Sequence, residues 1–185
     1  MRKKLSFIPV LMCGLLITSC GGSKLSGFNK KINSSIKEVS KVVIETKVSD
    51  NNVMVYSSIN NINITHEDKM ISGTSEKTIS TLNSNFEFKT SNISKTFSDV
   101  DEKSLHGFDL TEKNLKEYQI NKESTILNGK VDSEKVNKYF KVENFIPSED
   151  CNIEYQLTDS KLTKYSCSYV ADSKFLVTIT STYTY

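Results

Sequence analysis

The chain has 185 residues, of which 37% are apolar and 25% charged, and its formal net charge is +2. This length allows one domain with a hydrophobic core but leaves little room for two. Because globular proteins average about 45 to 50% apolar residues, the low apolar content predicts a thin core or one-sided sheets. Basic and acidic residues alternate locally, as in Glu67-Asp68-Lys69, so the sequence lacks the clustered positive charge that nucleic-acid binding requires.

The first twenty residues have the three-part layout of a secretory signal. A basic head at residues 2–4 precedes an apolar stretch from Leu5 to Ile17, and the small residue Ser19 stands before Cys20. A membrane-spanning helix needs about 20 apolar residues, so this stretch is too short to span a bilayer.

Ile17-Thr18-Ser19-Cys20 has a branched apolar residue three places before the cysteine and small residues between them. It resembles the lipobox of bacterial lipoproteins that are cut by signal peptidase II. The resemblance implies that residues 1–19 are removed and that Cys20 is lipidated as the mature N-terminus, which anchors an exported protein in a bacterial membrane at the cell surface or periplasmic face. The alternative is an ordinary signal peptide that happens to carry a cysteine. The mature chain would have 21 basic and 22 acidic residues and no arginine.

After the signal we expect a lipidated cysteine with a flexible tether over residues 20–27, and a single domain over residues 28–185. Apolar residues at helical spacing predict a helix that becomes a strand near Lys41: Phe28, Ile32, Ile36, Val39 and Val43.

Turn-forming residues divide the next segment into strands. Asp50-Asn51-Asn52 predicts a turn before a long antiparallel strand over residues 53–65, and a second turn at residues 66–69 leads to a strand from Met70. Between Ser72 and Asp99 the pattern is weak: Phe86 and Phe88 mark one strand, and residues 95–97 mark another.

Two short helices are expected further along the chain. Asp109-Leu-Thr-Glu112 has the pattern of a capping box that opens a helix through Tyr118. Residues 125–131 predict a strand interrupted at Asn128-Gly129 by a tight turn or a bulge. Asp132-Ser133 then caps a helix that carries Val136, Tyr139 and Phe140 and ends before Pro147.

Residues 151–157 and 161–170 alternate apolar and polar residues around a turn, which predicts a hairpin. A three-residue loop would place Cys151 directly opposite Cys167, within the range of Cα distances that a disulfide requires. In an exported chain we therefore expect these two residues to form a structural disulfide. The alternative is two unbridged thiols that pack as small apolar residues.

A third strand from Lys174 to about Thr184 completes a C-terminal meander whose three strands share one apolar face. This face either lines an apolar ligand cavity or is core beneath helices. Its residues are Ile153, Tyr155, Tyr165, Tyr169, Phe175, Val177 and Ile179.

These elements predict an α+β fold: an N-terminal helix, then a largely antiparallel, curved, half-barrel-like sheet with two further short helices and the C-terminal three-stranded meander. This layout is similar to that of the LolA and LppX/LprG families of lipoprotein-handling and lipid-carrying proteins. The resemblance implies that the curved sheet holds acyl chains.

The sequence offers no catalytic or metal-binding motif. His66 and His106 stand in polar contexts outside any zinc spacing and are expected at the surface, and we expect no cofactor and no enzymatic activity. Two hypotheses remain: a lipid-anchored envelope lipoprotein that binds a lipid or other apolar ligand, or a surface-displayed structural or protein-interaction lipoprotein without a cavity. The expected partners are the membrane, through the lipid on Cys20, and a lipid or an envelope protein.

Overall fold

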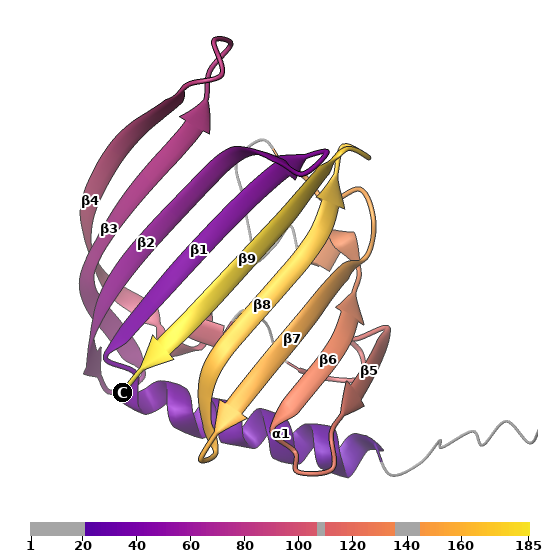
Figure 1. Ribbon diagram of the computed structural model, residues 1–185. Helices are drawn as coiled ribbons and strands as arrows, with labels where there is room; N and C mark the ends of the chain where they lie inside the picture. Colours follow the sequence, from indigo (N-terminus) through magenta and orange to yellow (C-terminus); the bar gives the residue numbers. More distant parts are fainter. Residues whose placement is uncertain (1–20, 107–109, 136–144) are drawn as a thin grey trace, which may run out of the picture.

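The computed structural model describes residues 21–106, 110–135 and 145–185. The strands are β1 (Lys41–Asp50), β2 (Val53–Glu67), β3 (Met70–Leu82), β4 (Phe88–Asp101), β5 (Glu117–Ile120), β6 (Ile126–Val131), β7 (Cys151–Thr158), β8 (Lys161–Ala171) and β9 (Phe175–Thr184). They form one antiparallel sheet of nine strands in the order β4-β3-β2-β1-β9-β8-β7-β6-β5 (Figure 1). The helical elements are α1 (Gly21–Ser35) and the 3-10 helices η1 (Ile36–Glu38) and η2 (Glu102–His106).

The α+β class predicted from the sequence is wrong, because the described residues form one large antiparallel sheet with a single long helix. The expected helix through Tyr118 is replaced by one turn, in which the amide of Leu115 donates to the carbonyl of Thr111 at 3.1 Å. Strand β5 begins two residues later and pairs with β6. The expected helix after Asp132-Ser133 is described only as far as residue 135, and Val136, Tyr139 and Phe140 lie outside the described residues.

Helix α1 begins at Gly21, so most of the expected tether over residues 20–27 instead forms its first turns. Leu25 lies on the same buried stripe as Phe28 and Ile32, which are 1% and 0% exposed. The predicted amphipathic helix and its change to a strand at Lys41 are confirmed. The tether expectation failed because Gly21, Gly22 and Gly27 weaken the helical signal of this segment.

Strand β4 is one continuous strand, whereas the sequence indicated two short ones. It forms the edge of the sheet, and most of its side chains are exposed on both faces. A strand without a buried face has no need of apolar alternation, which explains the weak pattern between Phe88 and Asp99.

Strand β6 passes straight through Asn128-Gly129, where the sequence suggested a turn or a bulge. Gly129 lies opposite Ile153, and a Cβ atom built on it would come within 3.2 Å of the carbonyl oxygen of Glu117. The glycine therefore accommodates a close approach of neighbouring strands and does not turn the chain.

Strands β7, β8 and β9 form the expected meander, but its register differs from the prediction. Asp159 and Ser160 both adopt positive φ angles, of 51° and 64°, in a two-residue turn. A bulge lies beside this turn, because Leu157 pairs with Leu162 whereas Gln156 pairs with Lys164. As a result, Cys167 lies opposite Ile153, and Cys151 is its diagonal neighbour. The expected direct opposition of the two cysteines is wrong.

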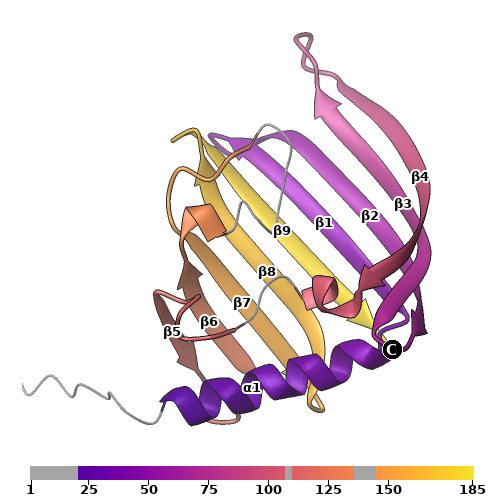
Figure 2. The same cartoon turned by 180° about the vertical axis from the view of Figure 1, so that it is seen from behind.

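The sheet is curved, and α1 and η2 lie on the same side of it (Figure 2). We call this side the inner face. Along β7, β8 and β9 the side chains alternate between buried inner positions and more exposed outer positions. The core lies between the inner face of these strands and α1, and it includes Phe28, Ile32 and Leu127.

Candidate ligand-binding site

The apolar face predicted for the C-terminal strands is core, with one exception. Six of its seven residues are at most 3% exposed: Ile153, Tyr155, Tyr165, Tyr169, Val177 and Ile179. They belong to the same cluster as the buried side chains of α1. The seventh residue, Phe175, is only partly buried and lines a cavity.

Tyrosine hydroxyls attach the covering segments to this part of the inner face. Tyr155 and Tyr183 donate to the carbonyl oxygens of His106 and Leu105, both at 2.7 Å, and hold η2 against the sheet. Tyr169 donates to the carbonyl oxygen of Phe145 at 3.2 Å. Burial raises the pKa of Tyr169 and Tyr183, so both phenols stay protonated donors at neutral pH. These tyrosines have a structural role.

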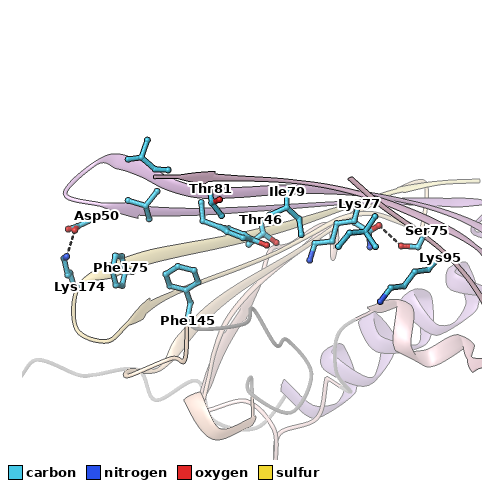
Figure 3. A pocket seen from close by; sticks show the side chains of 15 residues that line it. Thr46, Asp50, Ser75, Lys77, Ile79, Thr81, Lys95, Phe145, Lys174 and Phe175 are labelled. Carbon is cyan, nitrogen blue, oxygen red and sulfur yellow. Dashed lines mark hydrogen bonds and ion pairs between the residues drawn. The ribbon is translucent and has the colours of Figure 1, made fainter. Parts of the chain in front are cut away.

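The inner face of β1–β4 is open where the core ends. A cavity of about 920 Å³ lies there, between these strands, Phe145 and the start of β9 (Figure 3). This volume falls in the range of about 300 to 1,000 Å³ that is typical of small-molecule sites. Its lining residues are Thr46, Asp50, Val55, Tyr56, Asn60, Ser75, Lys77, Ile79, Thr81, Leu82, Ile93, Lys95, Phe145, Lys174 and Phe175.

Aromatic rings form one end of the cavity. The ring of Phe145 packs edge-on against Phe175, with 5.3 Å between centroids, and lies 5.9 Å from the ring of Tyr56. At the same end Lys174 forms an ion pair with Asp50 and stands 4.8 Å from the centre of the Phe175 ring. The three rings thus form an apolar surface at this end of the cavity, and the ion pair of Asp50 and Lys174 lies beside it.

Polar and cationic groups occupy the other end of the cavity. Ser75 donates a hydrogen bond of 2.7 Å to the side-chain oxygen of Asn60 on the neighbouring strand. Lys77 and Lys95 reach from β3 and β4 into the same space, with Ile79 between them and the aromatic end (Figure 3). The cavity is thus apolar and aromatic at one end and polar and basic at the other.

Cys151 and Cys167 are buried free thiols, so the structure contains no disulfide between them. The hydrogen bond between the two thiols raises the pKa of Cys151, with burial acting in the same direction, and lowers the pKa of Cys167. Both side chains belong to the core on the inner face and contribute no group to the cavity.

The two histidines are not surface residues, contrary to the prediction. His106 is 1% exposed. His66 is partly buried, with Nε2 at 2.8 Å from the carbonyl oxygen of Val39 and Nδ1 at 4.0 Å from the carboxylate of the buried Glu102. These contacts join β2 to η2 and close the core next to η1. Within the described ranges, no three His, Cys, Asp or Glu side chains gather in a way that could hold a metal ion.

Of the residues that the sequence analysis named as ligand-facing or core, only Phe175 lines the cavity. The residues that it missed include Tyr56, Lys77, Ile79, Ile93 and Lys95, which belong to strands rich in Ser, Thr and Asn. The available signal was the alternation Ser75-x-Lys77-x-Ile79-x-Thr81, which places these side chains on one face of β3.

No helix in residues 21–106, 110–135 and 145–185 is both long and apolar enough to cross a membrane. No protein-family model matches the chain, and a search of curated proteins finds no significant relative.

Proposed function

We propose that the protein is a non-enzymatic, lipid-anchored lipoprotein of the bacterial cell envelope that binds a lipid or another apolar ligand on the inner face of β1–β4. The observation that carries the binding function is the cavity of about 920 Å³ beside a filled core. Elsewhere on the inner face, α1, η2 and their neighbours cover the apolar side chains, and around the cavity Ile79 is only partly covered and Ile93 is 40% exposed. Burying such surface beneath a bound apolar ligand would be favourable.

The sequence at Cys20 supports the anchor. Acylation of Cys20 would place the lipid one residue before Gly21, where α1 begins. With no tether between them, the lipid would hold the domain close to the membrane surface.

Intact-mass and native mass spectrometry of the protein isolated from the membranes of its expression host test both parts of the proposal. Denaturing conditions should give the mass of residues 20–185 plus a covalent diacylglyceryl group, and native conditions should add a second, non-covalent lipid mass. An unmodified chain that retains residues 1–19 contradicts the anchor. Absence of bound lipid, together with no uptake of added lipid, contradicts the binding function.

A matched pair of tryptophan variants localises the binding. Ile79→Trp places an indole ring in the middle of the cavity and should lower the non-covalent lipid mass, because Ile79 points into the cavity (Figure 3). Thr65→Trp adds a tryptophan on an exposed position of β2 outside the cavity and should leave the lipid bound. Equal lipid retention by both variants would place the ligand elsewhere.

The alternative, an interaction lipoprotein, has one observation in its favour. Strand β4 is a 14-residue edge strand, and Phe88 and Ile93 on it are 47% and 40% exposed. An exposed edge can pair with a strand of another protein. A lipid-free protein that copurifies with an envelope protein, and loses this partner when Thr90, near the start of β4, is changed to proline, would support this function instead.

A further inference from the structure

Two lysines lie next to one another at the polar end of the cavity. Lys77 on β3 is opposite Ile93, and Lys95 on β4 is opposite Ser75, so the two lysines are diagonal neighbours on the same face. Such neighbours stand about 7 to 8 Å apart at the backbone, within joint reach of one small group. Both side chains extend from the sheet into the cavity, at the end opposite Phe145 and Phe175 (Figure 3).

Neither lysine has an acidic partner in the described part of the chain. The charged residues that line the cavity are Asp50, Lys77, Lys95 and Lys174, and Asp50 already pairs with Lys174 at the opposite end. Lys77 is partly buried beside Ile79 and Ile93. Holding a cation in partly apolar surroundings without a counter-charge costs free energy, which a bound anion would offset.

We infer that the ligand is an anionic amphiphile, with its carboxylate or phosphate group between Lys77 and Lys95 and its hydrocarbon chain directed toward Tyr56, Phe145 and Phe175. This inference rests on the proposed binding function and specifies its ligand class. The two ends of the cavity match the two ends of such a molecule. Lysine ammonium groups act as point charges without a fixed fork, so they accept either a carboxylate or a phosphate.

Displacement of the neutral fluorescent probe N-phenyl-1-naphthylamine from the purified, delipidated protein tests the inference. The competitors are hexadecanoate, palmitoyl lysophosphatidate and the neutral hexadecanol. The anionic competitors should displace the probe at concentrations about tenfold lower than the alcohol. The stronger of the two anions identifies whether the site prefers a carboxylate or a phosphate.

The double variant K77Q/K95Q should weaken the binding of both anions about tenfold and leave that of hexadecanol unchanged. Retained hexadecanol binding shows that the variant is folded. The matched control is K41Q/K47Q, which makes the same charge change on β1 outside the cavity and should behave as the unmodified protein.

Three outcomes would overturn the inference. Equal affinity for the acid and the alcohol, unaffected by K77Q/K95Q, would reject anion recognition and leave the proposed apolar binding intact. Equal losses in both double variants would indicate a general surface attraction outside the cavity. Failure of probe and competitors to bind would reject the proposed function together with the inference.

Discussion

At the scale of single residues, the sequence predicted on which face of the sheet a side chain lies, but it did not predict which residue lies opposite it on the neighbouring strand. The alternation in β7, β8 and β9 placed Ile153, Tyr155 and Tyr165 correctly on one face. The pairing register depended on the positive φ angles of Asp159 and Ser160. These angles are not evident from the sequence, because neither residue is glycine. The turn and the bulge together shift the pairing by two residues, so the face is preserved while the partner of Cys167 changes.

Two glycines give a matched test at this scale. Gly27 lies in α1, and a Cβ atom added to it meets nothing within 4 Å, whereas one added to Gly73 would lie 1.9 Å from the carbonyl oxygen of Asn63. Gly27→Ala should therefore raise the free energy of unfolding by about 0.5–1 kcal/mol, because alanine favours the helix. Gly73→Ala should lower it by about 1–3 kcal/mol, because backbone must move. Urea denaturation measures both, and equal effects of the two changes would contradict the fit of β3 against β2.

At the scale of elements, a clear sequence signal accompanied the long helix and the three C-terminal strands, each of which has a buried side. The spacing of Phe28, Ile32 and Ile36 revealed α1 because this stripe packs on the sheet. Strand β4 has no buried face and gave no such signal, while a local capping pattern near Glu112 was overridden when Tyr118 and Ile120 paired in β5. In both segments the pairing between strands determined the structure, and the local sequence pattern does not show which strands will pair.

Truncation of two phenylalanines that differ in burial tests which elements stabilise the fold. Phe28 in α1 is 1% exposed, and Phe88 at the start of β4 is 47% exposed. Phe28→Ala should lower the free energy of unfolding by about 3–5 kcal/mol, because it opens a hole between α1 and the sheet. The same truncation at Phe88 should change it by no more than about 0.5 kcal/mol. Comparable losses in chemical denaturation would mean that β4 packs more tightly than its exposure indicates.

At the scale of the whole molecule, the curved antiparallel sheet was predictable and the division of its inner face was not. The sequence offered two roles for the apolar face around Tyr165, namely core and cavity. In the structure this face is core, and the cavity lies over β1–β4. Which half is covered depends on where α1 and η2 pack, and no local pattern encodes that choice. The anchor expected at Cys20 rests on sequence alone, since residues 1–20 lie outside the described part.

The central claim, that a ligand occupies the inner face of β1–β4, is tested most directly by nuclear magnetic resonance of ¹⁵N-labelled protein titrated with hexadecanoate. Backbone amide shifts should change along the cavity, at Thr46, Ser75, Ile79 and Phe145, and saturate at one equivalent. Amides of the outer positions Lys47 and Thr65 should stay in place. Changes confined to the outer positions, or none at any hexadecanoate concentration, would contradict the account.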